Sequence, residues 1–164
     1  MRNRRRGTEL IEFTLLSIPV LFIGVSTIEC AIGMWEYSSM ENAVTVAARY
    51  AASHGASCGS PNSCTITLGT VATLIANTAP ALNPSRLTVT LTTNSGTTTC
   101  NPLSSCESST AQFPSSTDNA VGMDITIKAT YKITNPLPMY WPPRVDTDDA
   151  SRTLGATSRQ RIQF

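Results

Sequence analysis

Residues 13–28 have the sequence FTLLSIPVLFIGVSTI, which contains no formal charge, and this stretch decides the architecture of the chain. Glu12 and Glu29 flank it, and apolar residues extend the segment beyond both acids. As an α-helix, the 26 residues from 10 to 35 would extend about 39 Å, which exceeds the roughly 30 Å hydrocarbon core of a bilayer. We therefore predict a transmembrane helix over residues 8–35.

The segment before this helix is strongly basic. Residues 2–6 contain four arginines, a third of the 12 basic side chains of the chain. By the positive-inside rule, the N-terminus stays in the cytoplasm and the rest of the chain lies outside. A cleaved secretory signal peptide has the same basic start, but no A-x-A-like site follows the apolar run. A twin-arginine signal has hydrophobic residues where Gly7 and Thr8 stand, so a permanent anchor is favoured.

Composition narrows the class of protein further. The chain has 164 residues, 12 basic and 11 acidic side chains, and only 14% charged residues. A net charge of +1 gives no reason to expect a nucleic-acid partner. Serine and threonine fill about a quarter of the chain, and the low charge is unusual for a cytoplasmic domain. The length allows one small domain plus an anchor.

Glu12 is an expensive residue at the start of an apolar helix. An ionised carboxylate costs about 2.5–3.5 kcal/mol at the bilayer centre and less towards its rim, so such residues usually have a partner. A helix N-terminus carries partial positive charge, and a free amine there would carry a whole one. Cleavage after Gly7 would make Thr8 the first residue, one helical turn before Glu12.

A set of residues along this segment forms a recognisable pattern: the arginines up to Arg6, then Gly7, Thr8, Glu12, Phe13, Pro19 and Glu29. The pattern resembles the type IV pilin-type leader, and specifically the TadE-like minor pilins of the Tad (Flp) pilus system. The resemblance continues through the alanine-rich residues 42–52 and is looser over residues 122–135 and 159–161.

This resemblance implies cleavage after Gly7 by a membrane prepilin peptidase, N-methylation of Thr8, and pairing of Glu12 with the N-terminal amine of a neighbouring subunit. It also implies the partners, which are the peptidase, other pilin or pseudopilin subunits, the pilus assembly platform and the membrane. The implied location is the bacterial inner membrane, with a single pass and the head outside the cytoplasm, followed by the cell-surface pilus.

After the membrane span, residues 36–54 keep helical composition and would carry the helix out of the bilayer. Ala43, Ala47 and Ala51 fall on one face, a spacing that favours close helix packing. Residues 55–164 are rich in serine, threonine, glycine and proline, and we expect a small α+β, β-rich head. Within it we predict a short helix over 70–78, strands over 87–93, 124–133 and 152–162, and a loop over 94–119.

Five cysteines occur, and four of them lie in two similar polar loops. Five residues separate Cys58 from Cys64, and five separate Cys100 from Cys106. Two local disulfides are the natural interpretation outside the cytoplasm, although four cysteines permit three connectivities. A zinc site is the alternative, but zinc ligands usually have two to four residues between them. Cys30, within the span, is expected to be a buried thiol.

The sequence offers no catalytic constellation. The single histidine, His54, lies at a predicted helix end, where helix capping explains it. Residues 146–149 resemble the start of a calcium loop but lack its later glycine and glutamate. The proline-rich residues 135–144 contain Met139, Tyr140 and Trp141, which are expected to cover the core or, if exposed, to touch a partner or the membrane surface.

We therefore predict a non-enzymatic protein without a cofactor or metal. The leading interpretation is a minor pilin or pseudopilin with a leader at 1–7, a transmembrane helix at 8–35, a helical continuation at 36–54 and a head at 55–164. The alternative is a signal-anchored extracytoplasmic binding module that does not assemble into a filament.

Overall fold

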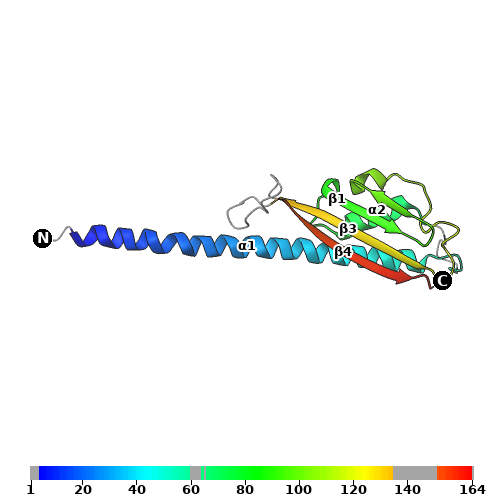
Figure 1. Cartoon of the computed structure of the whole chain (residues 1–164), viewed down its shortest axis with the longest axis horizontal. Coiled ribbons are helices and arrows are strands. Elements are labelled where there is room, and N and C mark those ends of the chain that lie inside the picture. The colour runs from blue at the N-terminus through cyan, green and yellow to red at the C-terminus, as the bar shows by residue number, and fades with distance from the viewer. Residues whose placement is uncertain (1–3, 60–63, 65, 135–150, 164) are drawn as a thin grey trace.

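The computed structural model describes residues 4–59, 64, 66–134 and 151–163. The elements along the chain are α1 (Arg4–Ser53), α2 (Leu68–Thr78), η1 (Pro84–Arg86), β1 (Leu87–Thr92), β2 (Thr97–Cys100), η2 (Leu103–Cys106), β3 (Asp124–Thr134) and β4 (Ser151–Arg161). Figure 1 shows α1 as a long rod, with the other elements gathered beside its C-terminal half. The α+β class and the disulfide-stabilised head are confirmed.

Helix α1 is continuous over 50 residues, which corresponds to about 75 Å at 1.5 Å per residue. The helix expected over residues 8–35 and its continuation over 36–54 form this one element, which starts earlier, at Arg4, and ends at Ser53. Pro19 lies inside it without ending it. The N-terminal half projects from the head (Figure 1), so the rod is much longer than the head requires.

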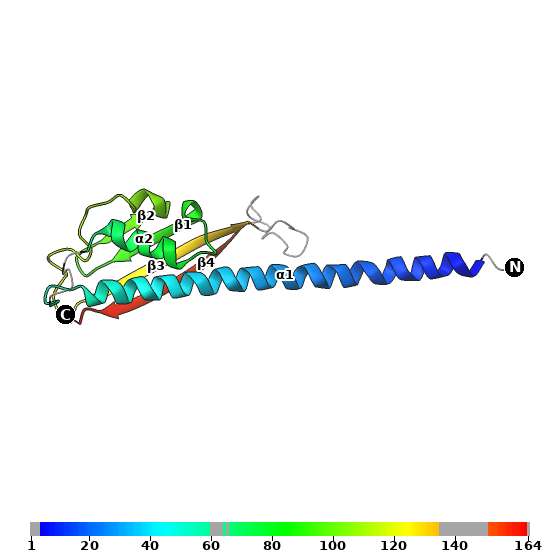
Figure 2. The same cartoon turned by 180° about the vertical axis from the view of Figure 1, so that it is seen from behind.

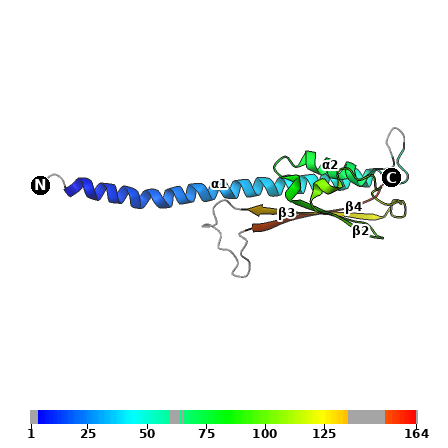
Figure 3. The same cartoon turned by 90° about the horizontal axis from the view of Figure 1, so that it is seen from above.

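The four strands form one antiparallel sheet in the order β2-β1-β3-β4. Its register aligns Cys100, Val89, Ala129 and Ala156 across the strands. Alternate residues of β1 are buried, as the pattern of Leu87, Val89 and Leu91 requires for a sheet covered on one face. Both α1 and α2 cover that face, as Figure 3 shows, and the other face carries mainly threonine and basic side chains.

The core lies between this sheet face and the two helices. The second half of α1 packs against β3, β4 and α2. It presents small side chains, with Ala43, Ala47 and Ala51 each at most 1% exposed. The facing strands β3 and β4 contribute Ala129 and Ala156, which are also buried. Small residues on both sides therefore allow the helix to lie close to the sheet. The spacing that the sequence suggested for helix packing is thus used within the head.

The expected loop over residues 94–119 is wrong in part, because it contains β2 and η2. A tight turn, closed by the amide of Thr93 donating to the carbonyl of Gly96 at 2.8 Å, returns the chain to pair with β1. The three threonines of β2 are exposed and only Cys100 is buried. Because β2 lacks alternating apolar residues, its sequence does not show the two-residue period of a half-buried strand. Its pairing with β1 makes it a strand.

Helix α2 lies beside α1 (Figure 2). On another side, its first residues are hydrogen-bonded to the backbone of the segment at residues 107–111. The amides of Leu68 and Gly69 donate to the carbonyls of Ala111 and Ser109 at 2.7 and 3.0 Å. A β-carbon at Gly69 would lie 2.5 Å from the carbonyl oxygen of Glu107. Glycine is therefore required at this position by the approach of two backbones.

Two disulfides close short loops of the head. Cys58 is bonded to Cys64 and Cys100 to Cys106, with Cα atoms 5.3 and 5.7 Å apart. Of the three connectivities that the sequence left open, the structure has the local one. The second bond ties the end of β2 to η2, whose Leu103 is fully buried.

The C-terminus closes the far end of the head. Ile162 is 1% exposed and its amide donates to the carbonyl of Met123. The next amide, of Gln163, donates to the carbonyl of Ala52 near the end of α1. The predictions for residues 135–144 and 146–149 fall outside the described residues.

Candidate assembly site

The projecting half of α1 carries a continuous apolar surface. Its large hydrophobic side chains are mostly more than half exposed, and the set comprises Leu10, Ile11, Phe13, Leu15, Leu16, Ile18, Val20, Leu21, Phe22, Ile23, Ile28, Ile32, Met34 and Trp35. Among the described residues, α1 is the one helix long and apolar enough to cross a membrane. An apolar surface of this extent on a rod is typical of a membrane span or of a packing surface between subunits.

The predicted processing and assembly residues all lie at the start of this helix. Gly7 and Thr8 are part of α1, and Glu12 follows Thr8 by one turn. The Glu12 side chain is exposed, and no described residue forms an ion pair with it. The next turn is polar as well, because the hydroxyl of Thr14 donates to the carbonyls of Leu10 and Ile11. The three residues of the predicted site thus belong to one rigid element.

Two further acids lie on α1 between Glu12 and the head. Glu29 and Glu36 are half-buried, and each has one carboxylate oxygen that is shielded from solvent without a hydrogen-bond partner in the described part of the chain. They stand seven residues apart, about two helical turns, so they share a face of the helix. Carboxylates in this state are costly unless a partner reaches them.

Cys30, which was expected to be a buried thiol within the span, lies on the surface of α1 and is not covered by the head. The physical reason is that the head covers only the second half of the helix. Residue 30 lies in the half that projects, so only a membrane or another subunit would cover it.

In the head, Asp118 joins two turns that are far apart in sequence. Its carboxylate accepts hydrogen bonds from the hydroxyl and the amide of Ser95, the latter at 3.1 Å, and from the hydroxyl of Ser115 at 3.3 Å. These donors favour the charged form, so the Ser95 hydroxyl above all holds the pKa of Asp118 below its usual value. Asp118 is 3% exposed, so this is a structural carboxylate fixed by its donors.

A second acid is fixed on the outer face of the sheet. Asp124 accepts from the Arg159 guanidinium at 2.7 Å and from Arg161 at 3.2 Å. Arg161 first and then Arg159 lower the pKa of Asp124 through these hydrogen bonds. Both arginines are 70% exposed, so the pair orders the strand ends more than it stabilises the fold.

Sequence reasoning missed both acids. The partner of Asp118 is 23 residues away, and no periodic pattern connects them. Asp118 lies between Ser115 and Asn119, a composition that is typical of a turn. This turn composition was the only feature of the sequence that indicated a structural role for Asp118.

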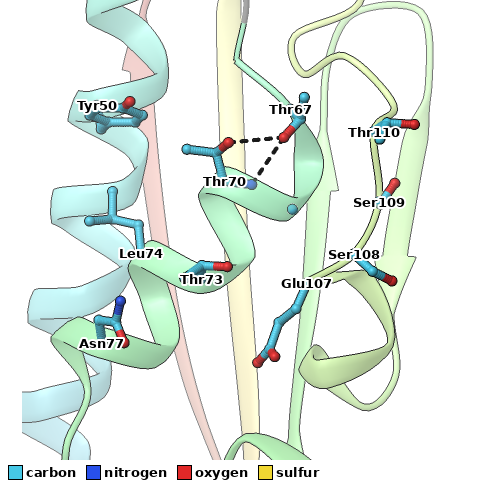
Figure 4. Close-up of a pocket in the computed structure, with 11 residues that line it drawn as sticks. Tyr50, Thr67, Thr70, Thr73, Leu74, Asn77, Glu107, Ser108, Ser109 and Thr110 are labelled. Carbon is cyan, nitrogen blue, oxygen red and sulfur yellow. Dashed lines mark hydrogen bonds between the residues drawn. The ribbon is translucent and has the colours of Figure 1, made fainter.

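A shallow groove of about 580 Å³ lies over the exposed side of α2. Figure 4 shows Thr70, Thr73 and Asn77 of α2 along it, with Tyr50 of α1 on one side and residues 107–110 on the other. Thr67 caps α2 by accepting from the amide of Thr70 at 3.2 Å. The lining is mainly hydroxyl groups with Glu107 as its one carboxylate, so it lacks the acid–base pair that general acid–base chemistry needs.

His54 caps the end of α1, as expected, because its Nδ1 lies 2.7 Å from the carbonyl oxygen of Tyr50. Its ring also lies 4.2 Å from the Tyr50 ring, centroid to centroid. Nowhere in the described ranges do three or more His, Cys, Asp or Glu side chains gather as metal ligands. Among the described acids, Asp118 and Asp124 form side-chain hydrogen bonds or ion pairs with other residues, and these contacts hold the fold together.

The candidate functional site therefore lies on α1, which carries the exposed apolar surface and Glu12. Residues 7–49 match the family model of TadE-like proteins. The TadE-like segment covers the predicted cleavage position, Glu12, the whole apolar surface and most of the helix that packs on the head. No curated protein and no solved structure matches the chain.

The family match and the fold together support three coarse conclusions. The match over residues 7–49 suggests a protein associated with a Tad pilus system, the TadE-like family is structural rather than enzymatic, and the long apolar helix suggests a membrane anchor. The family suggests interactions with pilin or other pilus components.

Proposed function

We propose that the chain is a minor pilin or pseudopilin of a Tad-type pilus that is made as a membrane-anchored precursor. A prepilin peptidase cleaves it after Gly7, and Thr8 becomes the methylated N-terminus. The subunit then leaves the inner membrane for the pilus or its initiation complex. The observation that carries this proposal is the uncovered apolar half of α1, with Glu12 near its start, inside the segment that matches the TadE-like family.

The proposed topology follows from charge. The arginines at residues 2–6 keep the leader in the cytoplasm, and α1 crosses the bilayer with its apolar half. The head then lies on the outer side, where its two disulfides are chemically stable. Because α1 is one continuous helix, the head is held at a fixed distance from the anchor.

Glu12 supplies the driving force for assembly in this mechanism. In the membrane its carboxylate lies near the hydrocarbon, which costs up to about 2.5–3.5 kcal/mol. In the assembled state, the free amine of Thr8 on a neighbouring subunit neutralises it. Removing one unpaired charge from lipid favours the assembled state, and the exposed apolar side chains of α1 then pack between subunits.

Processing is tested by the intact mass and N-terminal sequence of the protein purified from native membranes, with and without a functional prepilin peptidase. A methylated start at Thr8 that depends on the peptidase is expected. A start at Met1 in both strains would contradict the proposal and favour a signal-anchored binding module. A start beyond residue 26 would indicate an ordinary secreted head.

Assembly is tested separately with Glu12→Ala. We expect the variant to insert in the membrane and to be cleaved, but to be lost from sheared pili. Glu9→Ala is a matched control, because it removes a carboxylate from the same turn of α1 and leaves Glu12 in place. Normal incorporation of Glu12→Ala into filaments would refute the amine-pairing mechanism.

A further inference from the structure

The two edges of the sheet differ in length and regularity. The strand order leaves β2 at one edge and β4 at the other, as Figure 1 shows. Strand β2 has four residues, whereas β4 has 11, which pair with β3 in an uninterrupted register. Proteins usually protect an edge by keeping it short or by placing a proline or a bulge in it. Strand β4 has none of these features.

The hydrogen bonds show which backbone groups of β4 point away from β3. In an antiparallel pair, residues that bond to the partner strand alternate with residues that point away from it. The amide of Ile162 donates to the carbonyl of Met123 at 2.8 Å, so the even-numbered residues of β4 bond to β3. The edge-facing amides and carbonyls therefore belong to Thr153, Gly155, Thr157, Arg159 and Arg161.

The other side of the sheet gives the same assignment. The amide of Thr93 donates to the carbonyl of Gly96, so the odd-numbered residues of β1 bond to β2 and its even-numbered residues bond to β3. By the register, they meet the even-numbered residues of β3. The odd-numbered residues of β3 are left to bond to β4, and they lie opposite its even-numbered residues.

The free edge of β4 is open to solvent. All of the residues with edge-facing groups are exposed, and the exposure of Gly155 belongs to its backbone because glycine has no side chain. In the described part of the chain, nothing bonds to these groups across the edge. Arg159 and Arg161 do not shield the edge, because both guanidinium groups reach back to Asp124 of β3 at 2.7 and 3.2 Å. The free main-chain groups form a template for one more strand.

The charges beside this edge indicate which strand fits it. Arg159 and Arg161 share the carboxylate of Asp124, and β4 itself contains no acidic residue. A carboxylate on the outer face of an added strand would neutralise the remaining positive charge, because opposite charges on neighbouring strands attract. A second copy of β4 would bring only further arginines. If it paired antiparallel, its α1 would also point against the first, which two anchors of the same topology do not allow.

We propose that β4 is a β-augmentation site, at which an extended, acidic segment of a different pilus subunit adds a fifth strand to the four-stranded sheet. The proposal rests on the proposed function for the identity of the partner, because a minor subunit contacts subunits of other kinds. Main-chain hydrogen bonds supply the affinity of such a contact, and alternate side chains supply its specificity. The head would thus join the pilus through a contact separate from the apolar surface of α1.

Proline substitution tests the edge in the full-length chain, in cells that assemble the pilus. Thr157→Pro removes an edge-facing amide and leaves the bonds to β3 in place, a position at which edge strands tolerate proline. Its Tm in detergent micelles should stay within a few degrees of wild type, while its amount in sheared pili should fall several-fold. Thr157→Ala keeps the amide and should assemble normally. A folded Thr157→Pro protein that assembles like wild type would overturn the proposal.

Amide hydrogen exchange tests the pairing without any substitution. In the chain alone in detergent micelles, the edge-facing amides should exchange fast, and those of the residues between them should exchange slowly. In sheared pili, both sets should exchange slowly. Edge-facing amides that are slow in the chain alone, or fast in sheared pili, would overturn the contact. If they are protected in native membranes of cells whose sheared pili lack the wild-type chain, the contact stands and the pilin role is refuted.

Two further variants test the nature of the added strand. A benzophenone amino acid in place of Thr153 should cross-link to an extended acidic segment of another pilus subunit, and a cross-link to a second copy of this chain would overturn the proposal. Arg159→Glu should lower the amount of subunit in sheared pili several-fold. Lys128→Glu is its control, because Lys128 is exposed on the same face but lies one strand further from the edge. Equal recovery of these two charge variants would refute an acidic partner.

Discussion

Gly69→Ala is the substitution for which the structure gives the sharpest expectation. The new β-carbon would lie 2.5 Å from the carbonyl oxygen of Glu107 and 2.7 Å from that of Ser109, both below the 3.0 Å that such contacts reach. Both obstacles are backbone atoms, so no side-chain rotation relieves the clash. Helix α2 has to move away from this segment, which strains the hydrogen bonds from Leu68 and Gly69 at 2.7 and 3.0 Å.

The magnitude follows from three contributions. Overpacking a tight contact costs about 1–3 kcal/mol, and a weakened backbone hydrogen bond costs about 1 kcal/mol. Alanine is the better helix former by about 1 kcal/mol, which acts in the opposite direction. We expect the free energy of unfolding of the head to fall by about 2 kcal/mol, or about 8 °C in Tm for a domain of about 100 residues.

The assay is thermal unfolding of the full chain in detergent micelles, followed by near-ultraviolet circular dichroism at fixed protein and detergent concentrations. Gly96→Ala is the control, because no atom lies within 4 Å of the β-carbon it would add. Its Tm should stay within a degree or two of wild type, as expected for an open surface position. A Gly69→Ala protein as stable as wild type, or more stable, would refute the close-approach argument.

Further predictions concern the disulfides, the acids and the C-terminus. C100A/C106A should lower the free energy of unfolding by about 2 kcal/mol because it opens a seven-residue loop. Dithiothreitol should lower the Tm of wild type by more than that of the variant, which keeps only the Cys58–Cys64 bond. Because the pKa values of Asp118 and Asp124 are lowered in the folded state, their stabilisation is complete above the unfolded-chain value of about 3.9 and is lost as the pH falls further. Asp118→Asn should therefore flatten the acid limb of a Tm-against-pH curve, and a limb identical to wild type would contradict this role. Ile162→Ala, at a fully buried position, should cost about 2–5 kcal/mol, measured by urea unfolding.

Local patterns in the sequence were sufficient for the long helix and for much of the head. The uncharged run at residues 13–28 and the residues 36–53, which lack Gly and Pro, predict one rod, and the rod is continuous. The alternation in Leu87, Val89 and Leu91 marks β1 because burial on one face of a strand has a period of two. The pattern of Gly7, Thr8 and Glu12 spans six residues of one helix, so its spacing was also visible in the sequence alone.

Other features depend on contacts between segments that are distant in sequence. The strand β2 exists because a turn returns it to β1, and its exposed threonines carry no signal of their own. The requirement for glycine at residue 69 arises from a segment almost 40 residues later, and the partner of Asp118 arises from a turn 23 residues earlier. The exposure of Cys30 depends on where the head stops covering α1.

The sequence by itself therefore determined the long apolar helix, the basic segment before it and the class of the head, because hydrophobic length, charge and strand periodicity are properties of neighbouring residues. Only the tertiary structure decided which cysteines are joined, which face of the helix the head occupies and which charged residues are left for other molecules. These depend on how close non-neighbouring backbones come together, and a linear pattern does not contain that distance.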